Sequence, residues 1–342
     1  MELLGATSKE LQELCDKLDQ PAYRAKQMAS WLYKSGASSI DDMNNLPKEL
    51  RSRLAADHTL SRSRIVTESS APDGVRKFLL ELTDGQRIES VLLPYPDRLT
   101  VCVSTQVGCA AGCVFCASGE LGLARNLTPG EIVDQVLTLQ KQAGKRVTNV
   151  VYMGVGEPLL NYANVLKSVR LLNEEVGVSA RRITVSTVGV TPRIPDLARQ
   201  GTQITLAVSL HAPDDALRGQ LIPLARKYPL TELLQACRSY AESAGRRVTM
   251  EYLLLEGVND SPPQARQLAA LLKGMLCNVN LIPYNPVKGS RFRRPRSARV
   301  TAFRKVLEDA GLEVTQRFER GDNIAAACGQ LRRGRAQADT EP

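Results

Sequence analysis

The chain has 342 residues, of which 43% are hydrophobic and 24% are charged, and its formal net charge is +9. At roughly 150 residues per domain, this length predicts two domains or one large domain with additions. The composition excludes a collagen, a disordered tail and a small disulfide scaffold. No apolar run approaches the roughly 18 residues of a spanning helix. Residues 1–5 lack the pattern of a secretory signal, so we expect a protein of the cytoplasm.

Residues 1–60 predict a small helical domain. Thr7 and Glu10 have the spacing of a capping box, and apolar residues follow at helical intervals. Pro21 ends this helix, residues 25–33 form a second one, and Pro47 opens a third. The segment holds eight basic and nine acidic residues, so its composition indicates no strong electrostatic surface.

Residues 61–94 change to the period of β-strands. Two β-like runs, 77–82 and 87–94, stand on either side of Thr83-Asp84-Gly85, which predicts a hairpin. We therefore expect a short β extension between the helical domain and the rest of the chain. Glu89 lies in the second run, where a solvated strand residue is the ordinary expectation.

From residue 95 to 323, short β-rich runs alternate with helical segments such as 129–142 and 263–275. The candidate strands are 100–107, 149–153, 182–187, 203–209, 248–254 and 279–283. This alternation predicts an α/β fold with a parallel sheet and crossover helices. Six units are too few for a closed eight-stranded barrel, so we expect an open, partial β6/α6 barrel, with ligands at the carboxyl ends of its strands. Residues 324–342 then form a C-terminal segment.

Polar or glycine-containing groups follow several of these strands. They are Met153-Gly154-Val155-Gly156-Glu157-Pro158, Ser186-Thr187-Val188-Gly189, Ser209-Leu210-His211 and Pro283-Tyr284-Asn285-Pro286. Such groups suit a ligand with ribose hydroxyls and a charged amino-acid end. The sequence contains no Walker A motif and no G-x-G-x-x-G after a strand, so a nucleoside triphosphate or dinucleotide site is not supported.

Three of the eight cysteines, Cys109, Cys113 and Cys116, form a CxxxCxxC motif directly after the first of these strands. In a chain of this length such clustering indicates metal ligands or reactive thiols rather than a disulfide framework. A zinc site needs a fourth ligand, and neither histidine, His58 or His211, has metal-type spacing to the motif. Three thiolates fit a [4Fe–4S] cluster with one open iron better. A zinc-stapled turn is the structural alternative.

The net charge is concentrated near the C-terminus, where residues 287–342 hold 13 basic and 7 acidic residues. Six basic residues without an acidic one among them are Lys288, Arg291, Arg293, Arg294, Arg296 and Arg299. This run suits contacts with phosphate groups of an anionic partner, and a solvated loop is the alternative. For Arg332, Arg333 and Arg335 we expect a solvated tail.

The CxxxCxxC motif, with Phe115 before its third cysteine, resembles the signature of the radical S-adenosylmethionine (SAM) superfamily. Further segments resemble the RlmN family, in order and over nearly the whole chain: 21–27, 31–33, 46–47, 88–91, 102–109, 125–128, 153–158, 209–213 and 321–331. The resemblance implies an enzyme that methylates carbon 2 of an adenosine in 23S rRNA and of the adenosine 3′ of the anticodon in certain tRNAs. A sister group, of the Cfr type, methylates carbon 8, and residues 156–158 and 281–286 look more like the carbon-2 group.

The resemblance also implies which residues bind the cofactors. Cys109, Cys113 and Cys116 would hold the [4Fe–4S] cluster. The residues expected to contact SAM are Gly156, Glu157, Ser186, Ser209, Leu210, His211 and Asn285. The family needs an electron donor such as flavodoxin or ferredoxin, and no membrane is involved.

The remaining implied roles concern Cys328, Cys102 and Glu89. In the family scheme Cys328 takes a methyl group from one SAM, and a second SAM is cleaved to a radical that removes hydrogen from that methyl group. Two SAM are therefore used per turnover. The methylene carbon adds to the adenine, Cys102 attacks the Cys328 sulfur to release the RNA with formation of a transient disulfide, and Glu89 helps to remove the ring proton.

Other interpretations remain open at this level. Free cysteines are usually buried, and Cys15, Cys237 and Cys277 are expected to be core residues. A carbon-8 methyltransferase is the alternative within the enzyme class. A metal-stapled RNA-binding protein without catalysis is the alternative from another class, and it would not require the pair Cys102 and Cys328.

Overall fold

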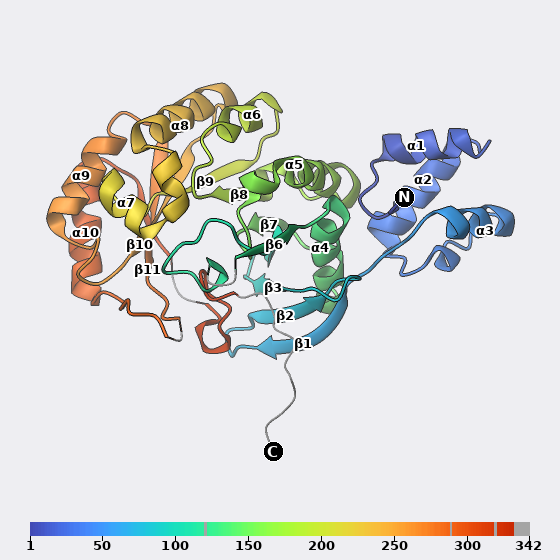
Figure 1. Ribbon diagram of the computed structural model, residues 1–342, viewed down its shortest axis with the longest axis horizontal. Helices are drawn as coiled ribbons and strands as arrows, with labels where there is room; N and C mark the ends of the chain where they lie inside the picture. The colour runs from blue at the N-terminus through green and yellow to red at the C-terminus, as the bar shows by residue number, and fades with distance from the viewer. Residues whose placement is uncertain (120–121, 288, 318–319, 332–342) are drawn as a thin grey trace, which may run out of the picture.

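The computed structural model describes residues 1–119, 122–287, 289–317 and 320–331, and one large sheet dominates it (Figure 1). In sheet order the strands are β1 (Arg64–Ser70), β2 (Arg76–Glu81), β3 (Arg87–Pro94), β4 (Leu99–Cys102), β7 (Asn149–Tyr152), β8 (Ile183–Thr187), β9 (Thr205–Ser209), β10 (Val248–Leu254), β11 (Cys277–Pro283) and β12 (Val314–Gln316). The strands from β4 to β12 run parallel, and β1 to β4 run antiparallel. Within the described residues β1 and β12 are the edges, so the sheet is open and the predicted fold class is confirmed.

Helices between the parallel strands cover the outer side of the curved sheet (Figure 1). They are α4 (Pro129–Ala143), α5 (Tyr162–Leu171), α6 (Arg193–Arg199), α7 (Asp215–Leu221), α8 (Leu230–Ala244), α9 (Pro262–Leu272) and α10 (Ser297–Asp309). The predicted helices 129–142 and 263–275 correspond to α4 and α9. Thr128 closes the first turn of α4 with a capping box, and Gly144 ends the helix in a left-handed conformation.

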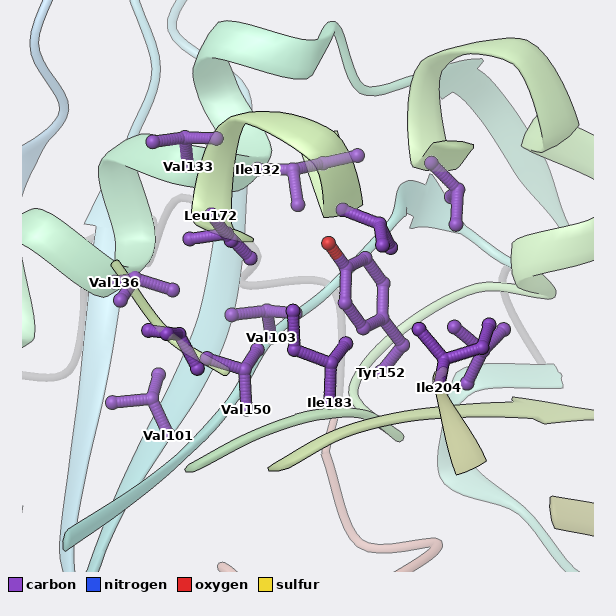
Figure 2. Close-up of a cluster of buried hydrophobic side chains, with 14 of the residues drawn as sticks. Val101, Val103, Ile132, Val133, Val136, Val150, Tyr152, Leu172, Ile183 and Ile204 are labelled. Atoms are coloured by element: carbon purple, nitrogen blue, oxygen red, sulfur yellow. The ribbon is translucent and has the colours of Figure 1, made fainter. Parts of the chain in front are cut away.

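The core lies between the sheet and these helices (Figure 2). Val101, Val150 and Ile183 project from β4, β7 and β8, and each is 0% exposed. Ile132 and Val136 of α4 belong to the same cluster of buried side chains and are equally buried. Each such side chain contributes roughly 1.5–3 kcal/mol when it leaves water, so this contact holds α4 against the first parallel strands.

The N-terminal helices lie at one end of the molecule, beyond α4 and α5 (Figure 1). They are α1 (Ser8–Lys17), α2 (Tyr23–Ser30), a π-helical turn (Trp31–Ser35) and α3 (Lys48–Asp57). The capping box of Thr7 and Glu10 forms as predicted. Lys167 of α5 pairs with Glu10 at 2.7 Å, so an ion pair joins the N-terminal helices to the helices that cover the sheet.

The predicted hairpin is present and is extended by a further strand. β2 and β3 pair on either side of the turn at Gly85, and β1 adds to the outer side of β2. β3 also pairs with β4, so the extension continues the parallel sheet without a break. The division of the chain into residues 1–60, 61–94, 95–323 and 324–342 stays a prediction.

Two strands differ from the expected pattern. The predicted strand 100–107 is divided, because β4 ends at Cys102 and β5 (Gln106–Gly108) leaves the sheet to pair with β6 (Leu123–Asn126). The strand β12 adds a seventh parallel strand to the six predicted. It contains only three residues, which is too short for an alternating pattern to be recognised. In the part of the chain that is described, no helix has the length and apolar character needed to cross a membrane.

Candidate active site

A cavity of about 150 Å³ lies at the carboxyl ends of the parallel strands. Predicted site residues that line it are Cys109, Cys113, Cys116, Gly156, Glu157, Ser186, Ser209, His211 and Cys328. They come from the cysteine loop after β5, the loop after β7, the carboxyl ends of β8 and β9, the residues that follow β9, and the C-terminal segment. Because parallel strands end at the same edge of a sheet, residues far apart in the sequence meet here.

The loop that carries the three cysteines begins and ends at a short antiparallel ribbon, β5 with β6. Cys109 N donates to Gly122 O at 2.9 Å. Gly108 has φ +82°, and a Cβ atom at this position would lie 1.9 Å from Gly122 O. Only glycine therefore allows the two ends of the loop to approach so closely.

Two other segments hold the middle of this loop. Val114 N donates to Leu221 O at the end of α7, at 3.1 Å, and Ala117 N donates to Gly329 O at 2.8 Å. Hydrogen bonds thus fix the loop on one side to α7 and on the other side to the C-terminal segment next to Cys328.

The environment of the three cysteines fits an iron–sulfur cluster. Burial raises the pKa of Cys109 to about 12 and raises the pKa values of Cys113 and Cys116 as well, so the thiols stay neutral until a metal displaces their protons. Across the described residues, no three His, Cys, Asp or Glu side chains converge as they would around one metal ion.

Glu157 lies beside the cysteine loop and is 2% exposed. Its carboxylate accepts hydrogen bonds from Val188 N at 2.7 Å and Leu159 N at 2.9 Å. Burial raises the pKa of Glu157 to about 7, and the two hydrogen bonds partly oppose this shift. The loops after β7 and β8 are therefore joined through a buried carboxyl group.

His211 follows β9 and is buried against Phe115 of the cysteine loop, edge to face, with ring centroids 5.1 Å apart. Its Nδ1 accepts from Leu253 N at 3.0 Å, which assigns the proton of the neutral ring to Nε2. Burial lowers the pKa of His211 to about 3, so the ring is neutral at physiological pH. The residue has φ +59°, which turns the chain sharply after the strand.

A second, smaller cavity of about 40 Å³ adjoins the first. Cys102, Asn285 and Cys328 line it, and Cys328 also lines the larger cavity. Burial raises the pKa of Cys102 to about 12. The Oδ1 atom of Asn285 is buried without a hydrogen-bond partner, and such an orphaned polar atom fits a site that a polar ligand completes.

The segment that carries Cys328 is anchored on several sides. Arg320 pairs with Asp73 in the turn between β1 and β2, at 3.3 Å. Gln330 Nε2 donates to Pro286 O at 3.0 Å, and Ser118 Oγ donates to Leu331 O at 2.7 Å. The β extension, the loop after β11 and the cysteine loop together hold Cys328 between the two cavities.

Two predicted residues do not line either cavity. Glu89 of β3 pairs with Lys77 at 3.0 Å, and the Lys77 ammonium also donates to Ala325 O at 3.3 Å. Leu210 is completely buried, and its main chain donates to Glu251 O and accepts from Arg218 Nε. Glu89 is thus connected to the Cys328 segment through Lys77, and Leu210 contributes main-chain structure at the strand end.

Sequence reasoning missed Arg317 and Glu251. Arg317 lines both cavities, and its charge is close enough to Cys328 and Cys102 to act on both thiols. Glu251 is 5% exposed in β10, where Asn280 Nδ2 donates to it at 2.7 Å. Glu251 could have been found in the sequence, because a charged residue inside an apolar parallel strand is unusual and indicates a site residue. Arg317 follows a strand too short to predict.

Arg291, Arg293, Arg294 and Arg296 lie between β11 and α10, and their side chains are exposed. Arg299 is also exposed, but it lies in the first turn of α10 and pairs with Asp260 at 3.7 Å. Lys288, Arg332, Arg333 and Arg335 lie outside the described residues. Of the other cysteines, Cys15 and Cys237 are buried in the core as expected, and Cys277 is half-buried against it.

Residues 103–269 match the radical SAM superfamily, and residues 1–60 match the ribosomal RNA large subunit methyltransferase N-terminal domain. A relative from Gloeobacter violaceus, named "Probable dual-specificity RNA methyltransferase RlmN", is 50% identical over 97% of this chain and 95% of its own. A relative of the same name from Synechococcus elongatus is also 50% identical, over 98% of this chain and 94% of its own.

The chain belongs to the RlmN family.

The crystal structure of a radical SAM methyltransferase from Sphaerobacter thermophilus agrees with this assignment. It is 50% identical in sequence, with a TM-score of 0.92 over 97% of this chain and 99% of that one. Membership of the radical SAM superfamily implies a [4Fe–4S] cluster and SAM. The cysteine loop and the orphaned Asn285 amide are features of this RlmN family member that fit those two groups.

Proposed function

We propose that this chain is a radical SAM methyltransferase that methylates carbon 2 of an adenosine in 23S rRNA and of the adenosine 3′ of the anticodon in tRNAs. The observation that carries the proposal is the shared cavity of Cys102 and Cys328, which adjoins the cavity of Cys109, Cys113 and Cys116. A protein that bound RNA without catalysis, and used the three cysteines only for a structural metal, would not require this second pair of thiols.

The larger cavity would bind the cofactors. Cys109, Cys113 and Cys116 would hold the cluster, and SAM would contact Gly156, Glu157, Ser186, Ser209 and His211 in this cavity. Of the other two expected SAM contacts, Asn285 would act from the smaller cavity, and Leu210 would act through the main chain of the strand end. When bound, the cluster and SAM supply a radical that removes a hydrogen atom from a methyl group. The chain's own part is to present that methyl group on Cys328, which lies at the junction of the two cavities.

Cys328 acts as the methyl carrier. Its thiolate would take the methyl group from one SAM, with S-adenosylhomocysteine as the leaving group. After hydrogen removal its methylene carbon would form a bond to adenine, and the resulting adduct radical would give up one electron, which the cluster could accept. Two SAM are then used per turnover. Arg317 lines both cavities together with Cys328, so a positive charge lies beside the sulfur that accepts the methyl group.

Cys102 acts as the resolving thiol. Its thiolate attacks the Cys328 sulfur, an S–S bond forms, and the bond between that sulfur and the RNA-bound carbon breaks. The carbon keeps the electron pair of that bond and takes up a proton, which makes it the methyl group. The disulfide must be reduced before the next turnover, as expected for a protein of the reducing cytoplasm. Glu89 would accept the ring proton, and its ion pair with Lys77 keeps this carboxylate near the Cys328 segment.

The partners follow from this chemistry. The exposed arginines between β11 and α10 suit the phosphates of rRNA and tRNA. A one-electron donor such as flavodoxin or ferredoxin would serve the cluster.

The test is nucleoside mass spectrometry of rRNA and tRNA from a strain that lacks this gene, with the restored gene as control. We expect 2-methyladenosine to disappear from both RNAs and to return with the gene. Loss of 8-methyladenosine instead would identify a carbon-8 enzyme. If neither nucleoside changes, the proposed activity is wrong.

A further inference from the structure

Arg218 of α7 is a completely buried guanidinium group, with an exposed fraction of 0%. Its hydrogen bonds go to main-chain carbonyls: Val188 O at 2.5 Å, Leu210 O at 3.2 Å, Ser209 O at 3.3 Å and Tyr228 O at 3.5 Å. Among the described residues it forms no ion pair with a carboxylate. Asp215, on the same helix, raises the pKa of Arg218 through its charge but does not contact the guanidinium. A buried charge without a contacting counter-ion is costly, which raises the question of what else compensates this one.

The helix that carries Arg218 packs directly against the cysteine loop. Val114 N donates to Leu221 O, one turn after Arg218. Cys113 and Cys116 pack against the apolar cluster that contains Leu221, so apolar side chains connect the helix to the thiols. Arg218 and Cys113 are close enough for the charge of each to affect the other.

Arg218 also joins the strand ends that line the larger cavity. Val188 N donates to Glu157, while Val188 O accepts from Arg218, so one peptide links the carboxyl group to the guanidinium. Burial lowers the pKa of Arg218 to about 10, and the group therefore stays protonated at neutral pH. A permanent positive charge is held within the wall of this cavity.

A bound cluster would provide the missing opposite charge. Its three thiolate ligands make the assembly anionic, and one-electron reduction adds a further negative charge. In a buried site of low dielectric constant, a nearby cation stabilises the reduced form more than the oxidised form. The net effect is a higher reduction potential.

We propose that Arg218 is the buried counter-charge of the iron–sulfur cluster and raises its reduction potential toward that of a one-electron donor protein. The inference rests on the proposed function, because it requires the cluster on Cys109, Cys113 and Cys116. Its observable is the potential of the cluster, which is separate from methylation of RNA.

The test compares Arg218→Met, which removes the charge and keeps a long apolar stem, with Arg218→Lys, which keeps the charge. Iron content and the cluster potential are measured on anaerobically reconstituted full-length protein, by redox titration with electron paramagnetic resonance. We expect Arg218→Met to lower the equilibrium constant for one-electron reduction of the cluster at least tenfold, which corresponds to 59 mV. Arg218→Lys should shift the potential far less. Arg226→Met is the matched control, because Arg226 is exposed and donates to Gly219 O on the same helix.

A Met variant with full iron content and the wild-type potential would overturn the proposal. Should that variant fail to fold, Arg218→Gln takes its place, and a potential equal to that of Arg218→Lys is the contrary result. Arg218→Lys could also lower the potential as far as the neutral variants, or all three variants could fail to fold. In either case the role of Arg218 would lie in its hydrogen bonds to the carbonyls, and the counter-charge would be refuted. A wild-type protein without iron would refute the cluster itself, which is a different outcome.

Discussion

Cys102 and Cys328 share a cavity but are held differently. Cys102 is 7% exposed at the end of β4, where the parallel sheet leaves it little freedom to move. Cys328 is half-buried on a segment without regular structure and reaches both cavities. The fixed position of Cys102 suits a resolving thiol, and the access of Cys328 to both cavities suits a methyl carrier.

Replacement of Cys328 by Ala should abolish methylation, because no other thiol of the described residues lies at the junction of the two cavities. The cluster should remain, since Cys328 is not one of its expected ligands. Methyl incorporation into RNA and iron content per chain measure the two properties. Cys277→Ala is the matched control and should retain turnover, because Cys277 lines neither cavity. Turnover in the Cys328 variant would exclude it as the methyl carrier.

Replacement of Cys102 by Ala should trap the protein on its RNA, because the bond between the Cys328 sulfur and the RNA-bound carbon is then not broken. A band that withstands denaturation and disappears with ribonuclease measures this adduct. The double variant Cys102→Ala/Cys328→Ala should give no adduct. Absence of the band in the single variant would remove Cys102 as the resolving thiol.

The neutral ring of His211 predicts a pH dependence of stability in the metal-free protein. The folded pKa is about 3, against 6.5 for an ordinary histidine, so the unfolded chain binds a proton that the folded chain excludes. Stability should therefore fall as the pH drops below 6.5, with a slope that approaches about 1.4 kcal/mol per pH unit.

His211→Asn tests this slope, because Asn keeps an acceptor for Leu253 N and tolerates a positive φ. Urea unfolding of both proteins between pH 7 and pH 5 should show a smaller loss of stability in the variant. His58→Asn replaces a half-buried histidine and should keep most of the slope. Parallel curves for wild type and His211→Asn would contradict the prediction.

At the scale of elements, the β5–β6 ribbon determines whether the cysteine loop can close. The predicted strand 100–107 contains both β4 and β5, and its composition does not reveal where it leaves the sheet. Ser104 N donates to Gln135 Oε1 of α4 at 2.8 Å, and Thr105 N donates to Val155 O at 2.8 Å, in place of sheet partners. These contacts with distant residues divide the strand, which a local pattern cannot predict.

Gly108→Ala should prevent closure of the loop, because the added Cβ would lie 1.9 Å from Gly122 O. We expect loss of most bound iron from a protein whose sheet still folds, measured by iron analysis and far-ultraviolet circular dichroism. The control is Gly144→Ala, which also has a positive φ but open space around it. It should cost about 1–2 kcal/mol of stability and retain its iron. Full iron content in Gly108→Ala would show that the loop does not need this close approach.

At the scale of the whole molecule, the positive charge is placed asymmetrically. The N-terminal 60 residues are nearly neutral, and the exposed arginines gather between β11 and α10. The carboxyl end of β11 also borders the second cavity, through Pro283 and Asn285. RNA phosphates bound by these arginines would therefore bring a nucleotide close to Cys328.

The double variant Arg291→Ala/Arg293→Ala should weaken RNA binding at all sequences and lower the slope of log affinity against log salt by about 2, one for each phosphate contact. Filter binding of tRNA across a salt series measures this slope. Arg304→Ala/Lys305→Ala removes the same charge from α10, where both residues pair with acidic neighbours. It should have the smaller effect, and equal slopes for the two double variants would argue against a specific contact.

Spacing and periodicity depend on near neighbours in the chain, and they were enough to predict the family, the α/β order, the CxxxCxxC loop and most strand-end groups. Three relations could be found only once the chain was folded: Cys102 and Cys328 share a cavity, Glu89 pairs with Lys77, and Arg218 is buried beside the cysteine loop. Each of them depends on the packing of elements that are distant in the sequence. Burial and charge pairing are properties of that packing, so a local pattern does not record them.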